Sequence, residues 1–290
     1  MKPTTTILVT GANGQLGKEI QVAAAAYPQF IFLFAGKEDL PIDNKESIVS
    51  FFKLHKIDFC INCAGYTAVD KAEIEKELAF AINAEAVGNL AAACKAANAD
   101  FIHISTDYVF DGTGTVPYKT TDLTNPVSVY GKSKLRGEEL AIANHPAAII
   151  IRTSWIFSSF ANNFVKTMLR LMKERESINV VNDQFGCPTY AADLAHAILQ
   201  IIQQYPDTTI QQHIYNYSNE GIISWYDFAI AIKELTNSKC IVNPIPTSQY
   251  PTPAKRPHYS VLDTTTIKNT FQLQIPNWKT SLQKCLRVIN

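Results

Sequence analysis

The amino-acid sequence predicts an α/β protein, with a doubly wound parallel sheet in its first half and a smaller α/β lobe in its second half. Short apolar runs alternate with longer helical patterns up to residue 155, and the apolar runs are continuous rather than alternating with polar residues. Continuous apolar strands are typical of a parallel sheet that helices cover on both faces. Strand–helix repetition with right-handed crossovers then gives the doubly wound arrangement.

The expected elements of the first half follow from these runs. Strands are predicted at Thr6–Gly11, Phe30–Gly36, Asp58–Gly65, Asp100–Thr106 and Ala147–Trp155. Helices are predicted at Leu16–Ala26, Ser47–His55, Glu75–Ala97 and Ser128–Ala143.

The pattern changes after Trp155. Helical stretches at 162–176 and 191–204 are interleaved with brief strands at 178–183 and 213–218. The segment 243–257 contains five prolines, and because proline lacks a backbone N–H we expect no regular structure there. We place a second lobe at 155–290 and expect some segments, about 190–217, to return to the first domain.

Composition excludes several classes of protein. The 290 residues are 47% hydrophobic and 18% charged, as in ordinary globular proteins. Lys plus Arg and Asp plus Glu are equal, at 26 each, so no charge bias favours nucleic acid or an acidic membrane surface as a partner. The first apolar run is too short for a signal peptide or a membrane span. We expect a cytoplasmic protein with no nucleic-acid or membrane partner.

The cysteines do not indicate a metal or redox site. The only close pair is Cys60 and Cys63, in an apolar run that reads as a strand. Residues three apart on a strand point to opposite faces, and no second Cys or His pair supplies the remaining ligands of a zinc site. We expect buried structural thiols and no metal.

A glycine-rich turn joins the first strand to the first helix. Gly11, Gly14 and Gly17 follow the spacing G-x-x-G-x-x-G. Glycines let backbone N–H groups approach a pyrophosphate, and the helix N-terminus favours its negative charge. Because the turn opens a strand–helix–strand chain, it predicts dinucleotide binding. Residues 1–154 are therefore interpreted as an NAD(P)-binding Rossmann domain, and 155–290 mainly as a substrate-binding lobe.

Both charge signs follow the second strand, where the cofactor's adenosine ribose is expected. A basic residue there favours the 2′-phosphate of NADPH, whereas an acid suits the free hydroxyls of NADH. Lys37 is followed by Glu38 and Asp39. Both cofactors remain candidates, and Lys37 favours NADPH.

Two further motifs converge on the same crevice. Ser105, Thr106, Asp107 and Tyr108 follow the fourth strand, and the carboxyl ends of the strands line the ligand crevice of such sheets. The next predicted helix carries Tyr130-x-x-x-Lys134, whose spacing puts both side chains on one helix face. A hydroxyl, a phenol and an ammonium can therefore meet beside the cofactor.

Together these motifs resemble the extended short-chain dehydrogenase/reductase superfamily. Longer matches run nearly end to end and resemble, within it, the dTDP-4-dehydrorhamnose reductase family: GANGQLG, STDYVFDG, VYGKSKLRGE, IRTSWIF, NNFVKTMLRL, VNDQFGCPTY and YPTPAKRP. The resemblance implies an NAD(P)H-dependent oxidoreductase that reduces dTDP-4-dehydro-L-rhamnose to dTDP-L-rhamnose, the last step of dTDP-rhamnose synthesis, for cell-surface polysaccharide.

The resemblance also implies roles for individual residues. Tyr130 would give a proton to the ketone oxygen, and Thr106 would hydrogen-bond that oxygen. Lys134 would bind the nicotinamide ribose and lower the pKa of the phenol. The other cofactor contacts that the resemblance implies are Gln15, Leu16, Ala64, Gly65 and Tyr66, together with glycines of the turn. Lys37 and Asp39 are added as cofactor contacts because of their charges after the second strand. The implied substrate contacts are Thr106, Asp107, Tyr108 and Trp155, and we add Asn163 and Arg256 as candidates for binding the diphosphate.

Other functions remain open at this point. The same scaffold serves nucleotide-sugar epimerases and dehydratases, although Asp107 is followed here by Tyr108 and not by the Glu of a typical dehydratase. Related chains also act as regulatory subunits of methionine adenosyltransferase.

Some relatives dimerise through magnesium held by glutamates. Glu19 fits one such position, but PTYAADLA offers no second glutamate. We expect a monomer or homodimer without a bridging metal. After the second strand, Leu40 and Ile42 flank Pro41 where relatives read Leu-Asp-Ile.

Overall fold

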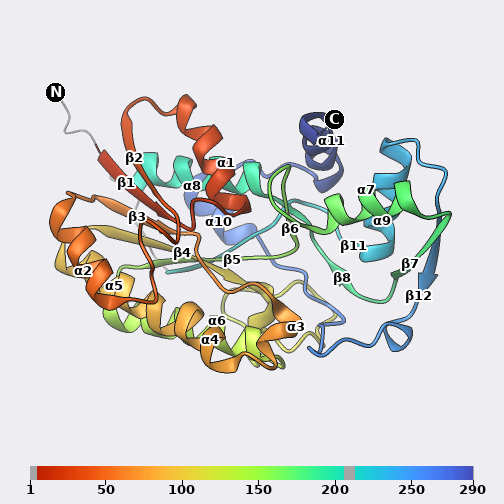
Figure 1. The fold of residues 1–290 in the computed structure, drawn as a ribbon, viewed down its shortest axis with the longest axis horizontal. Helices are drawn as coiled ribbons and strands as arrows, with labels where there is room; N and C mark the ends of the chain where they lie inside the picture. Colours follow the sequence, from red (N-terminus) through yellow and green to blue (C-terminus); the bar gives the residue numbers. More distant parts are fainter. Residues whose placement is uncertain (1–4, 206–212, 290) are drawn as a thin grey trace.

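A six-stranded, entirely parallel sheet forms the centre of the protein, in the order β10-β5-β4-β3-β1-β2 (Figure 1). The computed structural model describes residues 5–205 and 213–289. The six strands are β1 (Thr5–Thr10), β2 (Phe30–Ala35), β3 (Phe59–Asn62), β4 (Asp100–Thr106), β5 (Ile149–Thr153) and β10 (Ile214–Tyr217). The predicted doubly wound α/β class is confirmed.

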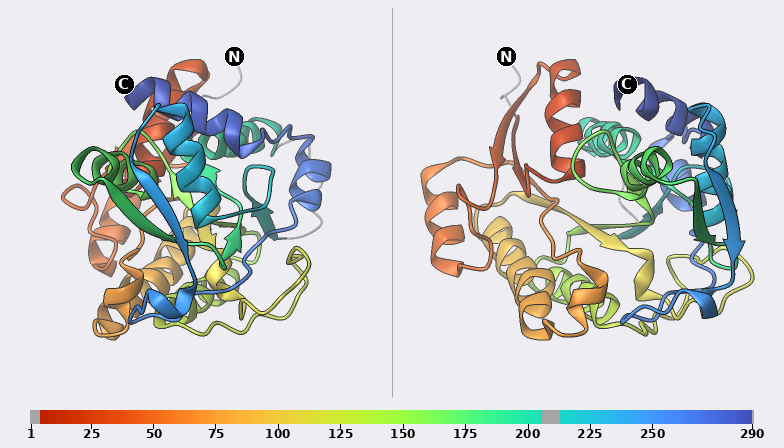
Figure 2. Two further views of the ribbon diagram at one scale, coloured as in Figure 1. Left: turned by 90° about the vertical axis from the view of Figure 1, so that its right-hand side faces the viewer. Right: turned by 45° about the vertical axis from the view of Figure 1, so that its right-hand side comes forward.

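Helices cover both faces of this sheet, as Figure 1 and the right-hand view of Figure 2 show. On one face lie α1 (Gln15–Ala23), α8 (Ala191–Gln204) and α10 (Thr265–Phe271). On the other lie α2 (Lys45–Leu54), α5 (Ala86–Ala96) and α6 (Val129–Asn144). Each layer of helices packs against the strands and encloses its own apolar core.

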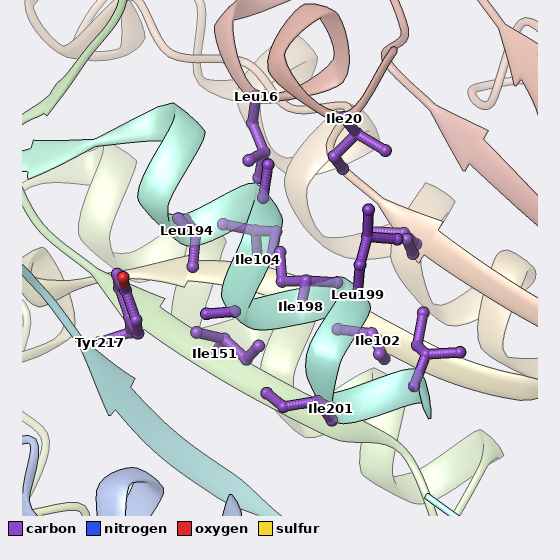
Figure 3. Close-up of a cluster of buried hydrophobic side chains, with 14 of the residues drawn as sticks. Leu16, Ile20, Ile102, Ile104, Ile151, Leu194, Ile198, Leu199, Ile201 and Tyr217 are labelled. Carbon is purple, nitrogen blue, oxygen red and sulfur yellow. The ribbon is translucent and has the colours of Figure 1, made fainter. Parts of the chain in front are cut away.

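The core beneath α8 shows how helix periodicity builds this packing. Leu194, Ile198 and Ile201 recur at three- and four-residue spacing and are fully buried. They meet Ile102 and Ile151 of the sheet in one cluster (Figure 3). Burying each such side chain stabilises the fold by roughly 1.5–3 kcal/mol.

The first-half strands and helices fall close to their predicted positions, with two physical differences. β2 is an edge strand, so its apolar run is only partly buried and Ile31 is 49% exposed. The predicted helix 75–97 is divided into α4 (Lys76–Phe80), a π-helical turn η2 (Ala81–Glu85) and α5. The short helices α3 (Val69–Ala72), η1 (Ala24–Ala26) and η3 (Asp107–Val109) complete this half.

The chain returns to the sheet after leaving it. α8 packs beside α1, and β10 adds to the sheet by pairing with β5. Part of the segment that we expected to return, residues 206–212, lies outside the described residues.

The remaining chain forms a third apolar cluster at one side of the sheet (Figure 1). Its helices are α7 (Phe164–Glu174), α9 (Trp225–Leu235), α11 (Trp278–Ile289) and the short η5 (Thr247–Gln249). Its paired strands are β7 (Ser177–Val181) with β12 (Ile241–Ile245), β6 (Ile156–Phe157) with β9 (Thr189–Tyr190), and β8 (Phe185–Gly186) with β11 (Ile223–Ser224).

The expectation of no regular structure at 243–257 was wrong in part. β12 runs through Pro244, which is in register with Val180 of β7, and η5 follows. β12 has β7 as its one neighbour in a two-stranded sheet, so Pro244 can occupy a position whose N–H is not needed for the pairing.

A buried ion pair fastens α6 to the sheet. The Arg152 guanidinium on β5 donates to both carboxylate oxygens of Glu138, with Nη2 at 2.7 Å from Oε2 and Nε at 3.0 Å from Oε1. The Ser105 hydroxyl donates to the same carboxylate at 2.5 Å. Nearby, Gly137 lies so close to the Asn83 carbonyl that a Cβ would approach its oxygen to 2.0 Å. These contacts set how closely α6 packs against the sheet and against the segment that carries Asn83.

Removing one member of this pair leaves a buried charge. We expect Arg152→Met to lower the free energy of unfolding by about 3–5 kcal/mol, measured by urea denaturation near pH 7. The matched control is Arg136→Met, which breaks the exposed pair between Arg136 and Glu139 and should cost less than about 1 kcal/mol. Equal losses in the two variants would contradict the anchoring role of Glu138 and Arg152.

Candidate active site

A cavity of about 750 Å³ opens at the carboxyl ends of β1, β3, β4 and β5, where segments of the second half close over the sheet. Its size is typical of a small-molecule site. The predicted site residues that line it are Gly11, Gly14, Gln15, Leu16, Lys37, Ala64, Gly65, Tyr66, Thr106, Asp107, Tyr108, Tyr130, Lys134, Trp155 and Arg256.

Three predicted residues do not line this cavity. Gly17 packs against the Gly11 carbonyl, where a Cβ would approach the oxygen to 2.5 Å. The carboxylate of Asp39 accepts a hydrogen bond from the Gly36 N–H at 2.8 Å and so closes the turn after β2. Asn163 is the N-cap of α7 and accepts from the Lys166 N–H. Each has a structural role here.

The glycine turn has the geometry that a pyrophosphate requires. Gly11 has φ +63°, and a Cβ there would lie 2.5 Å from the Ala64 nitrogen, so only glycine fits. Gly14 is the N-cap of α1 and has no side-chain cap hydrogen bond. The N-terminus of a nine-residue helix therefore faces the cavity with its dipole free to meet an anion.

The part of the cavity that follows β2 has a cationic rim and an apolar wall. Lys37 is exposed at the rim, while Leu40 and Ile42 are buried and contribute apolar wall. The departure from Leu-Asp-Ile therefore leaves the apolar contacts of this wall in place. A cation at the rim and an apolar wall suit a phosphorylated adenosine.

The segment after β3 is held by a residue that the sequence did not single out. Asn83, in the π-helical turn η2, accepts from the Tyr66 N–H at 2.8 Å and donates to the Tyr66 carbonyl at 3.0 Å. It also donates to the Ser133 hydroxyl on α6 at 3.0 Å. Asn83 thus ties two walls of the cavity together. A buried amide inside a helical pattern was the only signal for it.

Thr106 and Tyr130 both line the cavity and interact with each other there. Burial raises the pKa of the Tyr130 phenol above its usual value, and a hydrogen bond with Thr106 opposes this shift. The ring of Tyr108 lies edge-on to that of Tyr130, with centroids 5.5 Å apart. The phenol is therefore held protonated and faces the cavity.

Lys134 lies one helical turn after Tyr130 and is 5% exposed. Its Nζ donates to the Ile104 carbonyl at 2.6 Å and lies 3.2 Å from Nε2 of His103. Burial lowers the pKa of Lys134 to about 8, against an opposing effect of Glu138. In this structure the groups that shift the pKa of Tyr130 are burial, Thr106, Asp107 and Tyr108, so the expected lowering by Lys134 is not observed.

Trp155 and Trp225 form an aromatic wall of the cavity. Their rings stack with centroids 3.5 Å apart and planes 9° apart, and both line the cavity. Trp155 has φ +47°, an unusual conformation for a residue other than glycine, at a position just after β5. Trp225 was missed because it reads as the first residue of an ordinary capped helix.

Arg256 reaches the cavity from the proline-rich segment. Its Nη2 lies 2.8 Å from Oδ2 of Asp70 on α3, and its Nη1 lies 3.4 Å from the Tyr108 hydroxyl. The guanidinium thus bridges the two halves of the chain at the cavity rim, where it can exchange one partner for a phosphate.

Neither Glu19 nor Cys63 forms a metal centre in the described residues. Glu19 is 4% exposed and accepts from the Ser158 hydroxyl at 2.6 Å. Across residues 5–205 and 213–289, no three His, Cys, Asp or Glu side chains are grouped to hold a metal ion. Cys60 is buried as expected, but Cys63 is partly exposed because β3 ends at Asn62 and Cys63 lines the cavity.

The cavity fits a nicotinamide dinucleotide. The glycine cradle lies at one end, the hydroxyl, phenol and amine lie at the other, and both ends belong to one continuous space. The fold and this site define an oxidoreductase of the short-chain dehydrogenase/reductase type with a Rossmann fold.

Comparison with known proteins identifies the family within this class of oxidoreductases. A family model described as the RmlD substrate binding domain matches residues 5–290. The dTDP-4-dehydrorhamnose reductase of Aggregatibacter actinomycetemcomitans is 42% identical over 96% of this chain and 97% of its own. The chain belongs to the dTDP-4-dehydrorhamnose reductase family.

Solved structures agree with this assignment. A dTDP-4-dehydrorhamnose reductase from Clostridium acetobutylicum superposes with a TM-score of 0.94 at 41% identity, covering 98% of this chain and 99% of that one. The enzyme from Bacillus anthracis, solved in complex with NADP, gives a TM-score of 0.93 at 38% identity, with coverage of 98% and 99%. The family uses NAD(P)H as its cofactor.

The raised pKa of the buried Asp107 carboxyl can be tested through the pH dependence of protein stability. Burial raises the pKa of its carboxyl from 3.8 to about 6, so the cost of burying its charge appears as the pH rises from about 4 to about 6. We expect Asp107→Asn to be more stable than the native protein near pH 8, by up to about 3 kcal/mol, and the difference to vanish below about pH 4. Urea denaturation at several pH values measures this.

The control for this prediction is Asp111, four residues away. Hydrogen bonds from the Thr113 N–H and the Tyr118 hydroxyl lower its pKa, so Asp111→Asn should lose stability near neutral pH and lose less in acid. A pH-independent difference between Asp107→Asn and the native protein would show that the carboxyl of Asp107 does not titrate as described.

Proposed function

We propose that this protein reduces the 4-keto group of dTDP-4-dehydro-L-rhamnose with NAD(P)H, giving dTDP-L-rhamnose. The observation that carries the proposal is that one cavity joins the glycine cradle to Thr106, Tyr130 and Lys134 and then to the tryptophan wall. Membership of a reductase family favours this activity over the epimerase, dehydratase and regulatory-subunit alternatives.

The residues divide the chemistry among them. The reduced nicotinamide, when bound, supplies the hydride that reaches the carbonyl carbon. Tyr130 gives its phenol proton to the carbonyl oxygen, and the Thr106 hydroxyl stabilises the charge that develops there. Lys134 orients the nicotinamide ribose, to whose hydroxyls its charged ammonium donates hydrogen bonds. One hydride and one proton convert the ketone to the alcohol.

The substrate side suits a deoxysugar nucleotide. The stacked rings of Trp155 and Trp225 offer an apolar face for the sugar. Asp107 and Tyr108 lie at the end of β4 beside the reacting centre. Arg256 is placed at the rim to pair with a diphosphate oxygen. We propose that residues 1–154 carry the cofactor and 155–290 mainly carry the nucleotide sugar.

The direct test supplies dTDP-4-dehydro-6-deoxy-L-mannose, made in situ, and follows the loss of NAD(P)H absorbance. The proposal predicts ketosugar-dependent oxidation and formation of dTDP-L-rhamnose. Oxidation no faster than without the ketosugar would reject it.

A substitution at the proton donor separates chemistry from binding. We expect Tyr130→Phe to lose most of its kcat, since acid catalysis contributes about 10²–10⁴-fold, while its Kd for the cofactor stays close to the native value. Steady-state assays and fluorescence titration measure the two quantities. Turnover close to native would show that Tyr130 is not the acid.

We propose NADPH as the preferred cofactor because Lys37 lines the cavity close to the apolar wall formed by Leu40 and Ile42, where the adenosine is expected to bind. Lys37→Ala should raise KM for NADPH about tenfold, equivalent to a loss of about 1.4 kcal/mol of binding, and leave KM for NADH nearly unchanged. Lys132→Ala is the matched control, because Lys132 is an exposed lysine of α6 that does not line the cavity. Equal changes for both cofactors would argue against a 2′-phosphate contact.

We propose further that the protein acts in the cytoplasm, as a monomer or homodimer, to supply dTDP-L-rhamnose for a cell-surface polysaccharide. The structure contains, among its described residues, no helix with the length and apolar character of a membrane span.

A further inference from the structure

A chain of buried polar groups lies behind Lys134, on the side away from the cavity. It runs from Asn62 at the end of β3 to His103 on β4 and then to the lysine. Asn62 and His103 are both 0% exposed. Groups this deeply buried must satisfy one another, so each donor needs an acceptor.

The backbone fixes the orientation of the Asn62 amide. Oδ1 of Asn62 accepts from the Ala64 N–H at 3.2 Å and from the Thr10 hydroxyl at 2.7 Å. A hydroxyl can either donate or accept, but a backbone N–H can only donate. The atom facing Ala64 is therefore the oxygen, and Nδ2 points at His103.

The amide in turn fixes the tautomer of His103. Nδ2 of Asn62 lies 3.0 Å from Nδ1 of the ring, and because an amide nitrogen only donates, Nδ1 must accept. Burial lowers the pKa of His103 well below its usual value, so the ring is neutral and carries its single proton on Nε2.

Nε2–H of His103 then faces Nζ of Lys134 at 3.2 Å. An ammonium has no lone pair and cannot accept this hydrogen bond, whereas a neutral amine can accept it and still donate to the Ile104 carbonyl. We propose that Asn62 and His103 are positioning residues that stabilise the neutral form of Lys134, so that charging Lys134 requires the hydrogen bonds of this chain to rearrange. This inference rests on the proposed function only for its consequence in catalysis.

The other groups around Lys134 do not reverse this preference. Glu138, one turn later on α6, and Cys63, at the exit of β3, both favour the charged form, but burial has the larger effect and its direction is the opposite. The Glu138 carboxylate is already paired with Arg152. An ammonium donates three hydrogens and an amine only two, so the charged form of Lys134 binds the nicotinamide ribose of the proposed reaction more strongly. By favouring the neutral form, the chain therefore sets an upper pH limit on turnover.

Asn62→Asp tests the inference with almost no change of shape. The carboxylate would still accept from Ala64 and Thr10, but it would present an acceptor to His103. The ring should move its proton to Nδ1, Nε2 should accept from a charged Lys134, and the alkaline limb of kcat/KM should move up by about one pH unit.

The primary measurement is the ¹⁵N NMR shift of the His103 ring nitrogens in the protein alone, assigned by their loss in His103→Gln. The native protein should show protonated Nε2, and Asn62→Asp should show protonated Nδ1. His145 is the internal control, because its Nε2 lies 3.0 Å from the Ala99 carbonyl and should stay protonated in both.

Protonated Nδ1 in the native protein would overturn the inference, even if Asn62→Asp did not fold. An unmoved alkaline limb in a folded Asn62→Asp with the switched tautomer would equally overturn it. The tautomer is read without substrate, so failure of ketosugar reduction would reject the proposed function and leave this result standing.

Discussion

The structure depends on the burial of one face of α6. Tyr130, Lys134 and Glu138 follow one another at four-residue spacing, so all three lie on the same side of α6. This side packs against β4 and pairs with Arg152 of β5. An ionisable group taken out of water must find a partner or change its protonation state. Each of the three meets this constraint differently, and the differences give the site its chemistry.

Glu138 is neutralised by Arg152, and this pair anchors the helix without facing the cavity. Tyr130 remains a protonated phenol beside Thr106. Lys134, between them, has its Nζ directed at the Ile104 carbonyl and at His103. One helix therefore carries an anchor, a proton donor and a residue whose charge can be controlled. Asn83 holds the opposite wall to the same helix through Ser133.

Much of this arrangement could be predicted from the sequence because it is local. The parallel sheet follows from continuous apolar runs, and the positions of Thr106 and Tyr130 follow from the rule that strand ends line the crevice. β12 was not predicted, because the five prolines of segment 243–257 argued against a strand. A strand that pairs along only one edge, as β12 does with β7, can nevertheless contain proline. Asp39 was assigned to the cofactor from its position, yet its side chain closes the turn at Gly36.

The residues that were missed act through contacts between distant segments. Trp225 joins the cavity only because the second half folds back over the sheet and stacks it on Trp155. His103 sits in a strand whose pattern reads as ordinary core, and its role depends on Asn62, forty-one residues earlier in the chain. Such pairings have no signature in local spacing, and so a single sequence does not reveal them.

We propose that the phenol proton of Tyr130 moves to the ketosugar in the same step as the hydride. The most direct test is the solvent deuterium isotope effect on single-turnover NADPH oxidation, followed by stopped-flow absorbance with the enzyme in excess over the ketosugar. Transfer in a single step predicts a slower rate in D₂O at pH values where the rate is independent of pH. An identical rate in H₂O and D₂O would contradict it, because the proton would then be transferred outside the step that reduces the ketone.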